Sequence, residues 1–253
     1  MLPLSPDDAK KRLMLALDFD NREKAEEWVH KMKMHVGFFK VGLQLFTLAG
    51  PELVRSIRAR GGRVFLDVKY HDIPTTVALA CKGACALGID FINVHALGGK
   101  AMMRAAAEAL REASTGMRVA RPKLLAVTIL TSHDARSLKA EVGLRGGPDQ
   151  EVLRLAKMAK DCGADGVVCS PKEIAAVRKA CGKDFLIVTP GIRGASQARQ
   201  DQKRTLSAGQ AVSRGADYVV VGRPITAAAD PVEAAKAMTA EIQAATTKKG
   251  VKK

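Results

Sequence analysis

The stretch ALGIDFINV (residues 86–94) recurs in outline as DCGADGVVC (161–169) and SRGADYVVV (213–221). Each copy has the end of a helical segment, a glycine, an aspartate two residues later and then an apolar, β-rich run. Glycine is favoured just past a helix end because the backbone turns left-handed there. ARGGRVFLD (59–67) is a looser fourth copy. The recurrence predicts one helix-to-strand unit that is reused along the chain.

Apolar, β-rich runs of this kind occur eight times, and most are continuous rather than alternating. Such runs are typical of parallel strands that are covered on both faces. The expected strands span residues 13–19, 38–42, 63–68, 90–96, 123–130, 165–170, 185–190 and 217–222. The expected helices span residues 22–32, 51–60, 75–87, 100–113, 150–162, 171–181, 202–214 and 231–245. This alternation predicts an α/β fold of the (β/α)8 TIM-barrel type, with an open, doubly wound sheet as the alternative.

The composition is that of one globular domain. The chain has 253 residues, of which 47% are hydrophobic and 26% are charged, which excludes a disordered or collagen-like chain. No linker rich in Pro, Ser or Gly separates two zones of composition. We therefore expect residues 1–253 to form a single barrel domain, with a short, flexible, basic tail at about 246–253.

The charge balance indicates an anionic partner. There are 41 Lys and Arg residues against 26 Asp and Glu, a formal net charge of +15. Such an excess attracts nucleic acid, an acidic membrane or a phosphorylated metabolite. Aromatic residues are only 4%, and we find no nucleic-acid-binding motif and no apolar run of 18 residues. We expect neither nucleic acid nor membrane as the partner.

The cysteines and the first residues bear on the compartment. The five cysteines are an odd number, scattered through apolar stretches, which favours reduced, buried thiols over a disulfide framework. The opening MLPLSPDDAKKRL has no basic segment followed by an apolar core, so we expect no secretory signal. A cytoplasmic location is the expectation.

Charged residues inside and just after the strands are the unusual feature of the sequence. In a barrel of this type, the chemistry is placed at the carboxyl ends of the strands. Asp67 and Lys69 are two apart at one strand end, so their side chains point to the same side. Asp72 follows after a short turn, and Lys40 ends the preceding strand. Other polar residues at or just after the carboxyl ends of the expected strands are Asp18, His95, Thr131, Ser170, Arg193 and Arg223.

Two interpretations of the four clustered charges compete. Barrels place structural salt bridges at strand ends, and an isolated Asp–Lys pair is usually one of these. Four alternating charges on neighbouring strand ends are harder to explain in this way, because burial costs several kcal/mol for each ion before pairing offsets it. The pattern favours a functional cluster.

These residues resemble a known family. VFLDVKYHDIPTTV (64–77) has the D-x-K-x-x-D spacing followed by Ile-Pro-x-Thr, and it closely resembles the characteristic segment of orotidine 5′-phosphate decarboxylases. The resemblance extends from LALDF (15–19) to VGRPI (221–225). One departure is Thr75, where many members have Asn, and this puts only a minor contact in doubt.

The resemblance implies an enzyme that decarboxylates orotidine 5′-monophosphate to uridine 5′-monophosphate, the last step of de novo pyrimidine synthesis. It implies no cofactor and no metal, and the sequence has no metal-ligand spacing and no dinucleotide glycine motif. In the implied catalytic set, Lys69 is the proton donor beside C6, Asp67 faces the substrate carboxylate, and Lys40 bridges Asp67 and the ribose. Asp72 completes the set from the other subunit of a homodimer, together with Thr76.

The resemblance also implies a binding set for the rest of the nucleotide. Asp18 would lie on the ribose side, and Thr131, with Ser132 beside it, would hydrogen-bond the base. The phosphate would be held after the seventh and eighth strands, the usual phosphate location in such barrels. The residues implied there are Arg193, Gln202, Gly222 and Arg223, with residues 191–202 as a closing loop.

Two other functions remain as alternatives. A magnesium-dependent sugar-phosphate decarboxylase or aldolase of the same suprafamily would share D-x-K-x-x-D, but it places an acidic metal ligand where this chain has Lys40. A basic nucleic-acid-binding protein would explain the +15 charge directly. An assay of decarboxylation in the presence of a chelator separates the three.

Overall fold

The eight expected strands are present, and they form a closed barrel in chain order. The computed structural model describes residues 4–193 and 206–248. The strands are β1 (Leu13–Ala16), β2 (Phe38–Gly42), β3 (Val64–Tyr70), β4 (Phe91–His95), β5 (Lys123–Val127), β6 (Gly166–Val168), β7 (Leu186–Thr189) and β8 (Tyr218–Val221). The prediction of a (β/α)8 barrel is confirmed, and the open sheet is excluded.

The helices match the predicted ones with shifted ends. The longer helices are α2 (Arg22–Met32), α3 (Leu43–Ala59), α4 (Pro74–Cys85), α5 (Gly99–Met117), α7 (Pro148–Asp161), α8 (Ile174–Cys181), α9 (Ala208–Arg214) and α11 (Pro231–Lys248). Helix α3 consists of two helical segments separated by a kink at Gly50 (φ 62°), and the helix predicted over 51–60 is the second of them; the first segment, from Leu43, was not predicted. Helix α11 runs to Lys248, so the first residues assigned to the tail are helical.

The structure also contains short helices, before β1 and after β4, β5 and β8, that we did not predict from the sequence. They are α1 (Pro6–Lys10), the 3-10 turn η1 (Ala96–Gly98), α6 (Ala135–Ala140) and α10 (Arg223–Thr226). At four to six residues, the α-helices among them are too short to show a helical hydrophobic period. Of the helix predicted over 202–214, the described part begins at Ala208, where the Ser207 side chain caps it; residues 202–205 lie outside the described residues.

The chain divides into two compact units, which we describe separately. The first comprises residues 1–65 and 189–253, and the second comprises residues 66–188. In the first unit, β1 pairs in parallel with both β2 and β8, with Met14 opposite Phe38 and Val220. All four residues of β1 and all five of β2 are buried, as their continuous apolar pattern predicts.

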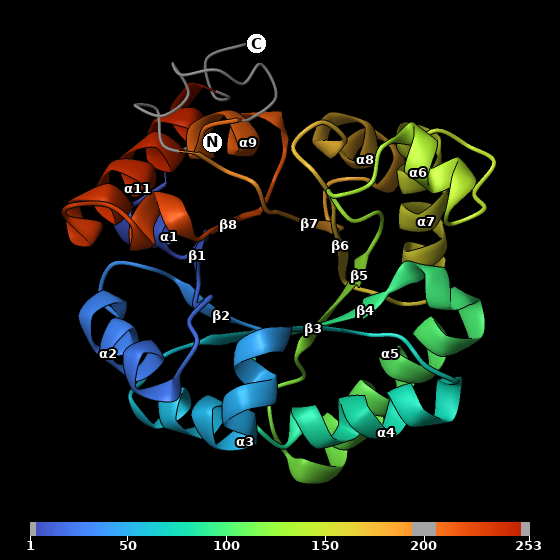
Figure 1. Cartoon of the computed structure of the whole chain (residues 1–253), viewed down its shortest axis with the longest axis horizontal. Coiled ribbons are helices and arrows are strands. Elements are labelled where there is room, and N and C mark those ends of the chain that lie inside the picture. Colours follow the sequence, from blue (N-terminus) through green and yellow to red (C-terminus); the bar gives the residue numbers. More distant parts are fainter. Residues whose placement is uncertain (1–3, 194–205, 249–253) are drawn as a thin grey trace. The chain divides into compact units, whose positions relative to one another are not determined.

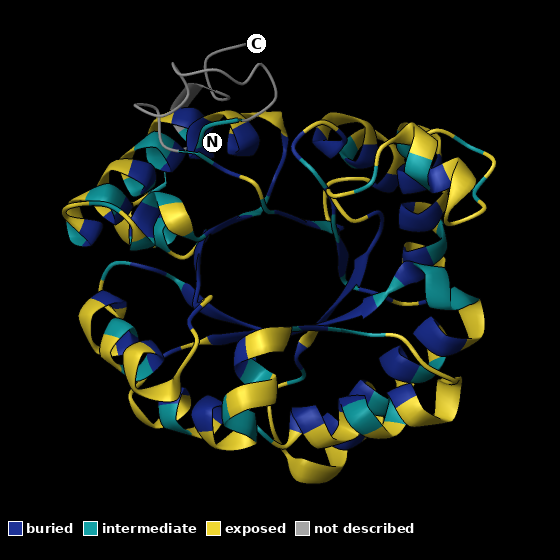
Figure 2. Cartoon of the chain, viewed as in Figure 1, coloured by how far each residue is buried: buried dark blue, intermediate teal, exposed yellow. Residues whose placement is uncertain are grey.

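In the second unit, β4, β5, β6 and β7 form an uninterrupted parallel ladder (Figure 1). Helices α4, α5, α7 and α8 pack outside it. Figure 2 shows that the strands are buried, whereas the outward faces of these helices are exposed. Each helix therefore contributes one apolar stripe to the core.

The glycines of the repeated stretch occupy the predicted conformation. Gly88, Gly163 and Gly215 each follow a helix and have φ values of 68°, 84° and 117°. Residues other than glycine rarely adopt these backbone angles. The glycine of each repeat therefore marks the left-handed turn between the end of a helix and the next strand. The predicted reuse of one helix-to-strand unit is confirmed.

Two further expectations concern chemistry and membranes. All five cysteines are free and buried, as expected for reduced thiols. Among the described residues, no helix combines the length and the apolar character needed to cross a bilayer.

Candidate active site

In the first unit, Lys40 and Asp18 form an ion pair at adjoining strand ends. Lys40 Nζ donates to Asp18 Oδ1 at 2.9 Å, and the Lys40 side chain is 10% exposed whereas that of Asp18 is 64% exposed. Gly42 leaves room for the ammonium group, because a Cβ there would lie 2.8 Å from Lys40 Nζ. The pair presents an exposed carboxylate beside a largely buried cation.

In the second unit, Asp67 and Lys69 form the predicted pair at the end of β3. Lys69 Nζ donates to Asp67 Oδ1 at 2.7 Å, which confirms that the two side chains lie on the same side. The side chain of Lys69 is 36% exposed and that of Asp67 is 14% exposed. The ammonium group is therefore reachable from solvent, whereas the carboxylate that holds it is largely buried.

Asn93 of β4 joins this pair, and sequence reasoning missed it. Its Nδ2 donates to Asp67 Oδ1 at 2.6 Å, and its Oδ1 accepts from the Lys69 backbone N–H at 2.8 Å. The filter for strand ends passed over it because it lies in the middle of the apolar run FINVH. A buried amide within such a run needs a partner, and that requirement was visible in the sequence.

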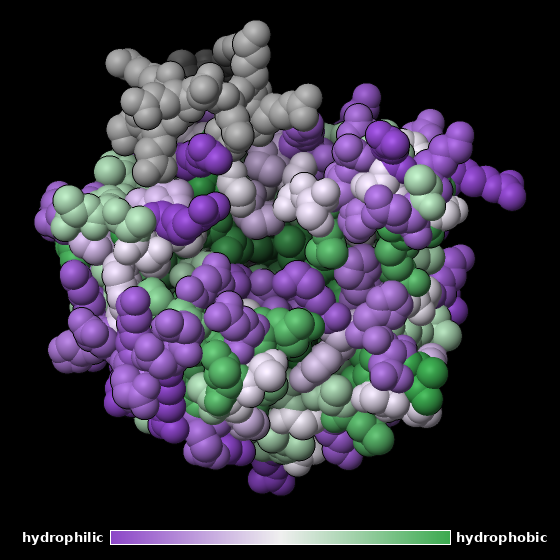
Figure 3. All heavy atoms as spheres, viewed as in Figure 1, coloured by the Kyte–Doolittle hydropathy of each residue, from purple (hydrophilic) through white to green (hydrophobic). Residues whose placement is uncertain are grey.

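Asp72 and Thr76 lie on the surface of the second unit. Asp72 Oδ1 accepts from the backbone N–H of Ile73 at 2.6 Å, just before helix α4 begins at Pro74. Both residues are exposed, and so are their apolar neighbours Ile73 (64%) and Leu79 (70%). Figure 3 shows apolar side chains at the surface over α4.

Two histidines stack beside the Asp67–Lys69 pair. The ring centroids of His71 and His95 are 5.6 Å apart and the rings are nearly parallel. His95 Nδ1 accepts from the backbone N–H of Leu97 at 3.3 Å, which places the proton of the neutral ring on Nε2. The pKa of His95 is lowered to about 4, chiefly by burial and to a smaller extent by the charges of His71, Lys69 and His133.

The predicted base and phosphate residues are only partly described. Thr131 is exposed in the segment after β5, and Arg223 is exposed at the start of α10. A Cβ on Gly222 would lie 3.5 Å from Ala16 Cβ and 3.6 Å from Asp18 Oδ2, which are ordinary contacts. The chain's own packing therefore does not demand glycine at this position.

The last two phosphate residues lie at the edge of the described part. The backbone N–H of Arg193 donates to the Leu206 carbonyl at 3.2 Å, next to the parallel bridge between Ile192 and Leu206. Gln202 lies outside the described residues, as does most of the predicted closing loop at 191–202.

Each unit offers a different chemistry. The second holds a cation against a carboxylate at a fixed position, an arrangement that can stabilise developing negative charge and deliver a proton. The first offers a carboxylate and an ammonium group suited to hydroxyl groups. Across residues 4–193 and 206–248, we find no three His, Cys, Asp or Glu side chains grouped to hold a metal ion.

Comparison with known proteins gives one consistent family. Residues 11–238 match the model of the "Orotidine 5′-phosphate decarboxylase / HUMPS family". The orotidine 5′-phosphate decarboxylase of Syntrophotalea carbinolica is 52% identical, covering 94% of this chain and 97% of its own. That of Moorella thermoacetica is 50% identical, covering 93% of each. The crystal structure of the Lactobacillus acidophilus enzyme superposes with a TM-score of 0.81 at 43% identity, covering 90% of this chain and 97% of the other.

Proposed function

This chain belongs to the orotidine 5′-phosphate decarboxylase family, and on that premise we propose how its residues divide the reaction among them. The enzyme decarboxylates orotidine 5′-monophosphate to uridine 5′-monophosphate in pyrimidine biosynthesis, as its close named relatives do. The single observation on which the assignment of roles rests is the Asp67–Lys69 pair, held at 2.7 Å.

The reaction sets a demanding electrostatic problem. The bond between C6 and the carboxylate breaks, CO₂ leaves, and the electron pair stays on C6 in the plane of the ring. A cofactor usually accepts the electrons of such a carbanion. We propose that a fixed cation stabilises it here, and that the reaction is independent of any cofactor or metal.

Lys69 is the cation that we place beside C6. Its ammonium group stabilises the developing negative charge and then gives one proton to C6, which forms the C–H bond that replaces the bond to CO₂. The neutral amine regains its proton from solvent, and the 36% exposure of this side chain permits that exchange. Lys69 is therefore both the electrostatic stabiliser and the general acid.

Asp67 has two roles in this proposal. It fixes the ammonium group of Lys69, and it faces the carboxylate of the substrate. Two like charges about 4 Å apart repel by roughly 4 kcal/mol at an effective dielectric constant of 20. The repulsion disappears as neutral CO₂ leaves, so it lowers the barrier from the bound substrate to the transition state.

We assign the rest of the nucleotide to the other predicted residues. The Lys40–Asp18 pair offers a donor and an acceptor to the ribose hydroxyls. Thr131 hydrogen-bonds the base, while Arg193, Gln202, Gly222 and Arg223 hold the phosphate. An arginine can grip a phosphate with two parallel hydrogen bonds, and a glycine lets the backbone approach closely.

We further propose a homodimer in which Asp72 and Thr76 enter the partner's active site. The exposed apolar side chains Ile73 and Leu79, on either side of Thr76, support this proposal. Large apolar side chains that gather on a surface mark sites of association. The five free, buried thiols support a reducing, cytoplasmic location.

The assignment is tested by assaying release of uridine 5′-monophosphate after dialysis against EDTA, with and without added Mg²⁺. We expect the activity to be unchanged by the chelator, whereas a loss that Mg²⁺ restores would favour the sugar-phosphate alternative. Lys69→Ala should remove almost all turnover, and Lys179→Ala on the exposed face of α8 serves as the matched control. Near-normal kcat in a folded Lys69→Ala variant would refute the role of Lys69.

A further inference from the structure

Asn93 has a fully buried polar side chain that makes two hydrogen bonds, one to Asp67 and one to Lys69. It is 0% exposed, in the centre of β4 and opposite Leu125 of β5. Its amide nitrogen Nδ2 donates to Asp67, and its amide oxygen Oδ1 accepts from the backbone N–H of Lys69. An amide buried among apolar strands is unfavourable unless it is hydrogen-bonded, so its place here is defined by these partners.

The orientation of the amide follows from the chemistry of its partners. A backbone N–H can only donate, so the group that meets Lys69 N must be the Asn93 oxygen. The amide nitrogen then faces the Asp67 carboxylate, which can only accept while it is ionised. No other side chain of this size offers a donor and an acceptor in this arrangement without carrying a charge.

The backbone of Lys69 shows why such an anchor is needed. Its φ is 53°, one of two left-handed residues other than glycine in the described part of the chain. A residue with a long side chain rarely adopts this backbone conformation, and the conformation persists only where surrounding groups hold the residue in place. Asn93 Oδ1 accepts the N–H of this residue, and Asp67, itself bonded by Asn93, accepts from its ammonium group.

From this geometry we infer that Asn93 is a positioning residue, which sets the place of the Lys69 ammonium group by holding that residue at both ends. It acts on the backbone end directly and on the ammonium end through Asp67. The inference rests on the proposed roles of Asp67 and Lys69. It adds that the proton donor is placed by a neutral amide in the neighbouring strand.

Two variants test the inference. Asn93→Ala removes both bonds, and we expect kcat to fall on the order of a hundredfold, since a displacement of about 1 Å can have that effect. Binding of uridine 5′-monophosphate should change less than about threefold, because the contacts to ribose, base and phosphate remain. A purely structural role would lower the melting temperature without this division between kcat and binding.

Asn93→Asp keeps the oxygen that accepts from Lys69 but places a second carboxyl oxygen against Asp67. Two carboxyl groups this close require a shared proton. The variant side chain can donate to Asp67, as the amide does, only when it is protonated, which happens as the pH falls. We expect the ratio of variant kcat to wild-type kcat to rise about tenfold from pH 9 to pH 6. The same ratio for Asn93→Ala should stay flat.

Asp165→Asn is the matched control. It replaces a carboxylate by an amide, the reverse of Asn93→Asp, and it lies at the amino end of β6, away from the Asp67–Lys69 pair. It should lower thermal stability and leave kcat unchanged. A kcat for Asn93→Ala within about threefold of wild type, or a flat ratio for Asn93→Asp, would overturn the inference. If Asn93→Ala does not fold, the pH ratio of Asn93→Asp decides alone. Should Lys69→Ala stay active, the roles in the proposed function fail instead.

Discussion

Arg223 is the residue whose predicted role best separates binding from chemistry. Its exposed side chain follows β8 directly after Gly222, and we assign it to the phosphate. Arg223→Ala removes a charge-assisted contact of about 1.5–3 kcal/mol, so kcat/KM should fall by roughly one to two decades. The test is orotidine, the nucleoside without phosphate, which wild type and variant should process almost equally. A variant impaired to the same degree on both substrates would show a role in the fold or the chemistry.

His95 gives the stability of the protein a pH dependence. Burial is the main cause of its pKa of about 4, below the ordinary 6.5, so the unfolded chain takes up the proton first. The stability is therefore complete above about pH 6.5 and declines as the pH falls toward 4. With allowance for its partial exposure, we expect about 1 kcal/mol to be lost by pH 5.

The measurement is urea unfolding at pH 7.5 and pH 5. His95→Asn is the comparison, since its side-chain oxygen can still accept from the N–H of Leu97 and it does not titrate. The wild type should lose more stability on acidification than this variant does. Equal losses would mean that His95 is not the group responsible.

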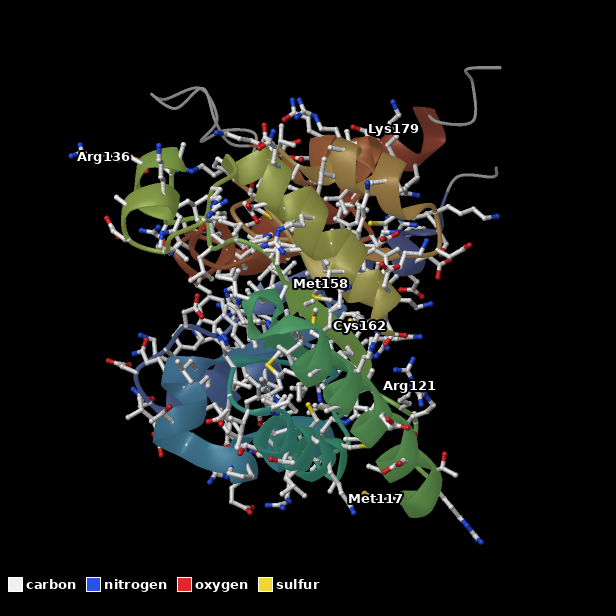
Figure 4. All side chains as sticks on the ribbon, turned by 90° about the vertical axis from the view of Figure 1, so that its right-hand side faces the viewer. Met117, Arg121, Arg136, Met158, Cys162 and Lys179 are labelled. Carbon is white, nitrogen blue, oxygen red and sulfur yellow. The ribbon has the colours of Figure 1, made fainter. Side chains whose placement is uncertain are left out.

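At the scale of elements, one ion pair ties the amino ends of β5 and β6 together. Asp165 accepts two hydrogen bonds from Arg121 at 2.6 and 2.9 Å, and it also accepts from the backbone N–H of Leu124. Burial raises the pKa of Asp165, but these bonds and the charges of Arg121 and Lys123 outweigh it and hold the pKa below its usual value. In Figure 4, Arg121 lies at the opposite end of the second unit from Arg136 of α6.

Asp165→Asn should therefore weaken the fold and spare the chemistry. Because it leaves two cations without their carboxylate, we expect a loss of about 2 kcal/mol, or roughly 4–8 °C in melting temperature. Calorimetry measures the shift, and kcat should equal that of the wild type. The stabilisation that Asp165 contributes is present above its ordinary pKa of 3.8 and disappears as the pH falls through the lowered value.

At the scale of the whole molecule, we propose that the chain unfolds as one domain. The boundary between the two units cuts through β3 after Phe65 and through β7 after Val188, and neither position is a linker. Trp28, the single tryptophan, reports on the first unit, while far-ultraviolet circular dichroism reports on helices of both. The two transitions should coincide, and separate midpoints would establish independent domains.

The proposed dimer makes a prediction about mixed subunits. Asp72→Asn and Lys69→Ala should each be inactive alone, since each removes one member of every site. A heterodimer of the two has one site with both residues intact, so mixing them after partial unfolding should restore part of the activity. Two preparations of Lys69→Ala, mixed in the same way, are the control. No recovery in verified heterodimers would count against shared sites.

Local physics made much of this protein readable from its sequence. The continuous apolar runs determined the eight strands, because strands buried on both faces need apolar side chains at every position. Gly88, Gly163 and Gly215 marked the helix ends, because few other residues adopt their φ angles. The two-residue spacing of Asp67 and Lys69 placed both side chains on one side of a strand.

Only the tertiary structure decided what depends on partners distant in the chain. Asn93 contacts Asp67 and Lys69 from 26 and 24 residues away, and Lys40 reaches Asp18 across 22. The left-handed backbone of Lys69 likewise has no local cause in the sequence around it. Such contacts depend on which strands are neighbours and in which register, and those are set by packing over the whole barrel rather than by the period of any one segment.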